Sequence, residues 1–343
     1  MDRRDFLCSA LTPIVLAAGS TLVRNRPGRT PYIMTVTGPV TPDDLGFTLP
    51  HEHVLVDFIG AERVSPGRYD RREVFDVARP HLERLRSLGG QALFECTPAY
   101  LGRDPLLLRE LSEATGVRIV TNTGHYGTRN NQHLPSHTFT ESAEQVAARW
   151  IREFEEGIDG TGIRPGFIKI GVDGQALSDI HRKLIRAAAL THLDTGLTIA
   201  AHTGPAVAAF GQIEVLREEG VAPSAWVWVH AQGESDTAAH VRAAEMGAWI
   251  SFDGVRPESI DRHVALVRTM KEHDLLHRVL LSHDAGWYHV GEPGGGTFRP
   301  FDTLFTSFIP AIRDAGLTDE EIHLLTVQNP AEAFMIRVRQ GNA

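Results

Sequence analysis

Cysteine and lysine are both scarce in this chain. Its 343 residues include two cysteines, Cys8 and Cys96, and only three of the 34 basic residues are lysines. Cys8 falls in an N-terminal segment that reads as a removable signal, so the mature protein would keep Cys96 alone. An intrachain disulfide is then excluded, even in an oxidising compartment.

Several protein classes are excluded by what else is missing. No window beyond the N-terminus approaches the roughly 18 to 20 apolar residues that a membrane-spanning helix needs. The formal net charge is -9, from 34 basic and 43 acidic residues, which argues against a nucleic-acid-binding protein. The 32 glycines and 19 prolines form no low-complexity tract or short repeat, so disorder and solenoids are poor interpretations. What remains is a chain that can bury a large core.

The first thirty residues differ from the rest. Arg3 and Arg4 precede Phe6, Leu7 and a short, weakly apolar run, which resembles a twin-arginine export signal; a disordered basic tail is the alternative. The segment 1–30 carries five arginines and two aspartates, +3, so residues 31–343 carry -12. We expect one domain over 31–343 in an exported protein, periplasmic or secreted. This route is used for folded cargo, which favours a metal loaded beforehand.

An α/β architecture is predicted by eight apolar, β-rich runs that alternate with segments of helical period. The runs span residues 47–57, 91–97, 117–123, 166–171, 197–202, 226–230, 248–252 and 278–284. Eight strands alternating with helices predict a (β/α)8 barrel, and residues 31–46 read as a short N-terminal β-hairpin. A doubly wound open sheet is second, because no G-x-G-x-x-G motif follows the first run.

In such a barrel the chemistry lies at the C-terminal ends of the strands. His51 and His53 lie two apart on the first run, so both can face one metal. The fifth, sixth and eighth runs end in His202, His230 and Asp284. Any single histidine is more often a satisfied polar residue than a ligand. One polar residue at each expected strand end, by contrast, indicates a metal site.

Lys169 lies inside the fourth run, in the apolar sequence from Gly166 to Gly171. An isolated charge is costly there unless it is paired or chemically altered. A structural lysine is the simplest interpretation. In a chain that so favours arginine, however, lysine at this position suggests that the amine is modified or acts as a nucleophile.

These residues carry a resemblance to a known family. The segment Thr48–Val54, with Lys169, His202, His230 and Asp284, resembles the phosphotriesterase family of the amidohydrolase superfamily, over about residues 35–334. The resemblance implies a first divalent metal on His51, His53 and Asp284, and a second on His202 and His230. It also implies that Lys169, as N6-carboxylysine, bridges the two metals. Family members often form dimers, so a homodimer is one expectation.

The chemistry implied is hydrolysis of a small molecule. A hydroxide bridging two cations attacks an ester or lactone carbonyl, or a phosphotriester, while one metal polarises the oxygen under attack. Asp284 is then placed to accept the proton, so that Asp284 and Lys169 are the catalytic residues beside the ligands. Zinc is the expected metal, with manganese, cobalt and iron as alternatives because imidazole and carboxylate suit all four.

The substrate pocket departs from the family's pattern. Where triesterases place an acidic residue after the strand-six histidine, this chain has Gly233 followed by Glu234. After Asp253, triesterases have histidine and many lactonases arginine, but here Gly254 follows and Arg256 comes two positions later. Either Glu234 and Arg256 take the place of these family residues from shifted positions, or the pocket serves another substrate.

Other loop residues also point to the substrate. The candidates for substrate contacts are Tyr126, Arg129, Glu234, Arg256, Trp287 and Tyr288. A solvated rim is the ordinary alternative for loop residues of this kind. So polar a set favours a polar ester or lactone, including one derived from a sugar, over an apolar phosphotriester.

Three other functions stay open from the sequence. A lyase could use Lys169 as a Schiff-base amine, and would be indifferent to chelators. A mononuclear deaminase of the same superfamily would keep His51, His53 and Asp284 but would not need the lysine. An exported protein that binds metal without turnover would leave every ester and lactone intact.

Overall fold

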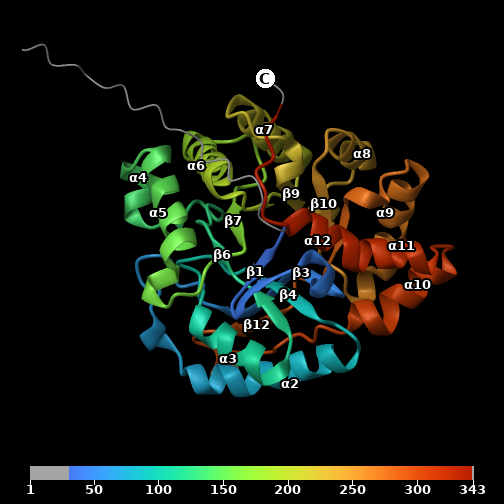
Figure 1. Ribbon diagram of the computed structural model, residues 1–343, viewed down its shortest axis with the longest axis horizontal. Coiled ribbons are helices and arrows are strands. Elements are labelled where there is room, and N and C mark those ends of the chain that lie inside the picture. The colour runs from blue at the N-terminus through green and yellow to red at the C-terminus, as the bar shows by residue number, and fades with distance from the viewer. Residues whose placement is uncertain (1–30, 342–343) are drawn as a thin grey trace, which may run out of the picture.

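A ring of parallel strands surrounded by helices forms the (β/α)8 barrel in the computed structural model, which describes residues 31–341 (Figure 1). The strands are β3 (Thr48–Val56), β4 (Ala92–Glu95), β5 (Arg118–Val120) with β6 (Asn122–Thr123), β7 (Phe167–Gly171), β8 (Ile199–His202), β9 (Trp226–Val229), β10 (Trp249–Phe252) and β11 (Val279–Leu281) with β12 (Gly286–His289). All eight runs expected from the sequence contain a strand. The predicted export signal lies outside the described residues and stays a prediction.

The eighth strand is split in two, and each half pairs with a different neighbouring strand. β11 pairs in parallel with β10, whereas β12 pairs in parallel with β3, with Gly286 opposite His53. Between the halves Asp284 has a φ of 53°, and its backbone N–H donates to the carbonyl of His51 at 3.1 Å. Asp284 therefore lies where the last strand meets the first.

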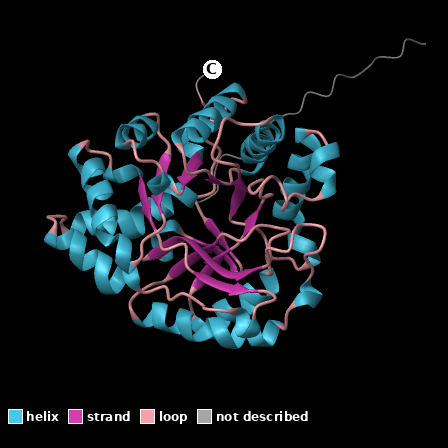
Figure 2. Cartoon of the chain, turned by 180° about the vertical axis from the view of Figure 1, so that it is seen from behind, coloured by secondary structure: helices cyan, strands magenta, loops and turns pink. Residues whose placement is uncertain are grey.

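The helices surround the strands on the outside (Figure 2). The longer ones are α2 (Arg71–Ser87), α3 (Pro105–Thr115), α5 (Ala143–Glu156), α6 (Asp179–Thr195), α7 (Ala206–Glu218), α8 (Thr237–Glu245) and α9 (Ile260–Glu272). The shorter ones are α4 (Ser136–Thr140), α10 (Ile309–Asp314), α11 (Asp319–His323) and α12 (Asn329–Phe334). Within residues 31–341, no helix combines the length and apolarity that crossing a bilayer requires.

Local sequence signals set the ends of these helices. Ser178 accepts a hydrogen bond from the backbone N–H of His181 at the start of α6. Gly196 ends the same helix with a φ of 80°, a conformation that glycine adopts without steric cost. Ser142 with Gln145, and Thr318 with Glu321, form capping boxes at the starts of α5 and α11.

The expected N-terminal hairpin is present. β1 (Ile33–Thr35) and β2 (Gly38–Val40) pair antiparallel, and the short helix α1 (Pro42–Leu45) follows. Ile33 and Leu45 belong to the same buried apolar cluster as Phe94 and Phe167, which lie inside the barrel. The hairpin therefore covers the N-terminal end of the barrel, opposite the ends of the strands where His202 and Asp284 lie.

Along a strand, the side chains that face the barrel interior change from apolar to polar. On β7, Phe167 belongs to the apolar cluster, and Lys169, two residues further on, lies beside His51. On β8, Ala200 belongs to that cluster and His202 follows it at the strand end. Because side chains two apart share a face, the same strands line both an apolar half and a polar half of the interior.

Candidate metal centre

A cavity of about 410 Å³ opens where the strands end. Its walls include the ligand-type residues expected from the sequence, and these come from β3, β7, β8 and the segments after β9 and β11: His51, His53, Lys169, His202, His230 and Asp284. Five distant parts of the chain thus meet in one cavity.

The first group combines His51 and His53 with Asp284. The pairing of β3 with β4 shifts register between Leu49 and Glu52, a stretch that includes His51 and ends just before His53. Asp284 Oδ1 lies 3.6 Å from His51 Nε2 and 3.2 Å from His53 Nε2. Two atoms that bind one tetrahedral metal at about 2.1 Å lie about 3.4 Å apart. These spacings therefore fit a shared cation.

Asp284 also has one carboxylate oxygen without a hydrogen bond in the described part of the chain. Its Oδ1 is buried and has no hydrogen-bond partner among the described residues, although it lies close to the two imidazoles. Burial raises the pKa of this carboxyl above its ordinary value. A buried, unpartnered carboxylate oxygen beside two imidazoles is what a metal-binding residue looks like before the metal is bound.

The second group contains His202 and His230. Their ring centroids lie 4.3 Å apart, and His51 lies 5.0 Å from His230 by the same measure. His230 has a φ of 62°, so the chain turns sharply just after β9 and brings the imidazole over the cavity. The two groups are therefore neighbours within one site.

In all four histidines the ring atom that is hydrogen-bonded to a neighbouring side chain is Nδ1. The Nδ1 atoms of His51 and His230 hydrogen bond to Asp253, at 2.9 Å and 2.6 Å. The Nδ1 of His53 bonds to Thr97 Oγ1 at 2.8 Å, and that of His202 bonds to Tyr126 OH at 2.9 Å. A partner on Nδ1 fixes the ring and leaves the Nε2 lone pair free for a metal, as in most histidine-metal sites.

Three of the histidines are favoured in the neutral form. Burial, with a contribution from Lys169, lowers the pKa of His51 to about 4. Burial also lowers the pKa values of His53 and His202 well below 6.5. Burial alone would lower the pKa of His230 too, but the ion pair with Asp253 raises it. Neutral imidazole is the form that binds metal, and burial favours this form at His51, His53 and His202.

Lys169 is buried without a counter-ion. Its side chain is among the largest fully enclosed ones, and Nζ lies 3.5 Å from His51 Nε2. Within residues 31–341 no carboxylate forms an ion pair with it. An ammonium here would donate to the very lone pair that a metal needs.

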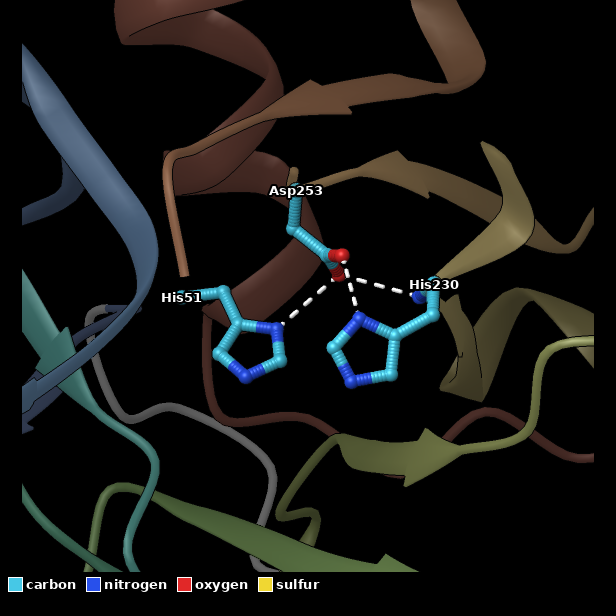
Figure 3. Close-up of side chains that lie close together, drawn as sticks. All are labelled: His51, His230 and Asp253. Carbon is cyan, nitrogen blue, oxygen red and sulfur yellow. Dashed lines mark hydrogen bonds and ion pairs between the residues drawn. The ribbon is translucent and has the colours of Figure 1, made fainter. Parts of the chain in front are cut away.

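Asp253 is a site residue whose role the sequence did not reveal. It follows β10 directly and is fully buried, and its carboxylate accepts from His51 and His230 (Figure 3). Both contacts are hydrogen bonds to Nδ1, the ring atom opposite the Nε2 expected to bind metal, so Asp253 acts as the hydrogen-bond acceptor of both rings. An acidic residue directly after a buried strand is the signal that could have found it.

The six residues expected to contact substrate divide into two sets. Tyr126, Arg129 and Trp287 line the cavity. The Trp287 ring lies 4.0 Å from that of His53, and the Arg129 guanidinium lies 4.5 Å from the ring centre of Phe58.

The other three lie elsewhere. Glu234 accepts hydrogen bonds from the backbone N–H groups of Ala206, Ser235 and Asp236, which lower the pKa of its carboxyl. Arg256 is exposed and lies 3.7 Å from Glu258, and Tyr288 is buried. None of these three is among the residues that line the described cavity.

Residues 31–334 match the Phosphotriesterase family. A phosphotriesterase homology protein of Mycobacterium tuberculosis is 30% identical over 329 residues, which cover 91% of this chain and 99% of that protein. The aryldialkylphosphatase of Saccharolobus solfataricus is 28% identical over 308 residues, covering 85% and 95%. The organophosphorus hydrolase structure from Deinococcus radiodurans matches with a TM-score of 0.80 at 29% identity, covering 90% and 99%.

Proposed function

The chain belongs to the phosphotriesterase family and is a metal-dependent hydrolase acting on ester bonds, and from this premise we propose which residues hold its metals and what it cleaves. His51, His53 and Asp284 hold one divalent cation, and His202 and His230 hold a second. The observation that carries the assignment is that all four histidines are held through Nδ1, so that Nε2 is free to bind metal. We propose zinc at both positions, with manganese, cobalt or iron as alternatives.

Lys169 is proposed to bridge the two cations as a carbamate. A buried ammonium with no counter-ion, 3.5 Å from His51 Nε2, would oppose metal binding at that imidazole. Carboxylation joins Nζ to the carbon of CO2 and releases two protons from the ammonium, so a negative charge replaces the positive one and two oxygens become available as ligands. The same step removes the buried, unpaired cation and completes both ligand sets.

Bound in this way, two divalent cations would polarise the carbonyl or phosphoryl oxygen of a substrate and make water a nucleophile near neutral pH. Asp284 presents a carboxylate inside the cavity, where it can accept the proton of the attacking water and pass it to the leaving group. Asp253, Thr97 and Tyr126 keep the imidazoles oriented while this happens.

For the substrate we propose a polar ester or lactone, including sugar-derived lactones. The cavity combines aromatic surfaces, Phe58 and Trp287, with the charged groups of Arg129 and Asp173. Aromatic faces with nearby hydrogen-bonding groups suit a ring that carries hydroxyls better than a purely apolar one. Phosphotriesters are the second candidate, because aryldialkylphosphatase is the name of one relative.

The test combines metal content with rates on lactone and organophosphate panels. We expect about two metals per chain and lactone hydrolysis that chelators abolish. Lys169→Ala should lose metal and fall in rate by more than about a hundredfold, since losing only an outer partner of a ligand already costs 10- to 100-fold. Lys183→Ala is the matched control, because that lysine binds the carbonyls of Phe139 and Glu141 on the outside.

Other results would favour the other functions. Full metal content and full rates in Lys169→Ala would contradict the bridge. Borohydride trapping with substrate, together with indifference to chelators, would favour a lyase. One metal per chain would favour the mononuclear alternative, and binding of two metals without turnover on either panel would favour a binding protein. The homodimer and the absence of nucleic-acid binding stay predictions.

A further inference from the structure

We infer that Asp253 is a positioning residue shared by both metal sites, so that one carboxylate sets the affinity of both cations. The inference rests on the proposed function, because it takes His51 and His230 as ligands of different metals. Asp253 itself follows β10 and lies between the two histidines, where it contacts the Nδ1 atom of each ring (Figure 3).

The Asp253 carboxylate has no free capacity. Its Oδ1 accepts from His230 Nδ1 at 2.6 Å and from Gln232 Nε2 at 3.0 Å. Its Oδ2 accepts from His51 Nδ1 at 2.9 Å, Ser251 Oγ at 2.9 Å and the backbone N–H of His230 at 3.0 Å. Five donors saturate a carboxylate that has about four lone-pair sites. The group is therefore fixed and fully charged, and it has no lone pair left for a metal.

The partners of Asp253 differ from those of the other two histidines. Thr97 contacts the ring nitrogen of His53 alone, and Tyr126 contacts that of His202 alone. Among residues 31–341, Asp253 alone hydrogen-bonds to the Nδ1 atoms of two of the four imidazoles, one on β3 and one just after β9. In the described structure, Thr97 and Tyr126 thus each support one histidine, whereas Asp253 supports two.

The carboxylate is chemically suited to this double task. It accepts an Nδ1–H from each ring, so both rings adopt the tautomer whose Nε2 carries a free lone pair. An amide of the same shape offers one acceptor oxygen and one N–H₂ donor. In Asp253→Asn one imidazole meets a donor, shifts its proton to Nε2 and masks its metal-binding atom. The other imidazole keeps only a neutral oxygen as its acceptor.

Titration of the metal-free protein with Zn²⁺, followed by calorimetry, tests the inference without using activity. The wild type should bind two ions. Asp253→Asn should weaken both binding events by tenfold or more, whereas Thr97→Val and Tyr126→Phe should each weaken one event, and not the same one. If Asp253→Asn weakened one event only, or if each control weakened both, the inference would be overturned while two-metal binding by the wild type still supported the proposed function.

A second measurement needs no variant and therefore cannot fail through misfolding. Nitrogen-15 NMR of the histidine side chains in the metal-free wild type should show a hydrogen-bonded Nδ1–H on both His51 and His230. A proton on Nε2 and none on Nδ1 in either ring would overturn the inference. A wild type that binds fewer than two zinc ions would instead count against the proposed function, whatever the tautomers are.

Discussion

The two halves of the barrel interior use the same strands for opposite purposes. In the half near the N-terminal hairpin, Phe94, Phe167 and Phe334 pack with ring centroids 4.1 to 5.6 Å apart. In the other half, the buried side chains include imidazoles, carboxylates and Lys169. On β7 the change occurs between Phe167 and Lys169. On one strand of the barrel, therefore, a residue that stabilises the fold and a residue of the functional site can lie only two positions apart.

The two halves also differ in backbone strain. His230, Asp284 and Trp287 all have positive φ angles, at 62°, 53° and 78°. Such conformations at residues other than glycine cost on the order of 1 to 3 kcal/mol each and persist only where the surroundings impose them. Local hydrogen bonds hold two of these residues: the backbone N–H of His230 donates to Asp253, and that of Asp284 donates to the carbonyl of His51.

The largest expected effect comes from Asp284→Asn in the polar half. Loss of the proton acceptor and of a charged ligand should lower kcat by about 10²- to 10⁴-fold. The free energy of unfolding of the metal-free protein should stay constant or rise, because the charge on a buried, unpartnered carboxylate oxygen is removed. Steady-state kinetics on the best substrate of the panel and denaturant unfolding measure both. Arg256→Ala, at an exposed residue, is the control and should change neither; a variant with more than a tenth of the wild-type rate would contradict the role of Asp284.

Phe94→Ala in the apolar half should have the opposite pattern to Asp284→Asn: a large loss of stability and little change in rate. The side chain is fully buried between Phe167 and Phe334, so its removal should cost about 3 to 5 kcal/mol of unfolding free energy. The rate per folded molecule should stay within about threefold of the wild type, because stability and turnover are assigned to different halves. Denaturant unfolding and active-site titration with metal measure the two quantities. A large loss of rate at full folding would show that the halves are coupled.

The smallest expected effect is on the pH dependence of stability, and it comes from His192. It lies near the end of α6, where its Nδ1 bonds to the carbonyl of Leu197 and its Nε2 accepts from the backbone N–H of Arg339. Burial lowers its pKa from 6.5 to about 4. Between those values the unfolded chain binds a proton that the folded protein does not, so stability falls as the pH falls from 6.5 towards 4.

His192→Gln should remove this part of the pH dependence, because glutamine can make both hydrogen bonds without titrating. Below pH 6.5 the wild type should lose up to about 1.4 kcal/mol per pH unit relative to the variant. Unfolding free energies of both proteins at intervals from pH 7 to pH 4 measure the difference. Two parallel curves would mean that His192 is not held neutral.

The sequence was sufficient for the barrel and for the convergence of the ligand-type residues. Strands could be predicted because buried parallel strands are short, apolar runs between helical segments. Once eight strands are placed, His202, His230 and Asp284 must approach one another, since the strand ends meet at one face of the barrel. The prediction depended on position along strands and not on the conformation of any loop.

Loop residues could not be placed in the same way. Glu234 was expected near substrate, but three backbone N–H groups bind its carboxylate and hold it at the start of α7. Asp253 was noticed only for the residue that follows it, because nothing in the sequence states that two distant imidazoles share its carboxylate. Hydrogen bonds of this kind depend on side-chain geometry, which follows from packing and not from a sequence period.

The split of the eighth strand has a consequence for biosynthesis. A ribosome adds residues in order, and the pairing of β12 with β3 requires residues that come after position 285. A nascent chain that ends before position 284 has His51 and His53 but lacks the carboxylate of Asp284, so the first cation position is incomplete. We therefore expect metal capture to wait until the last strand has been synthesised and docked, which makes loading a late event in the maturation of the enzyme.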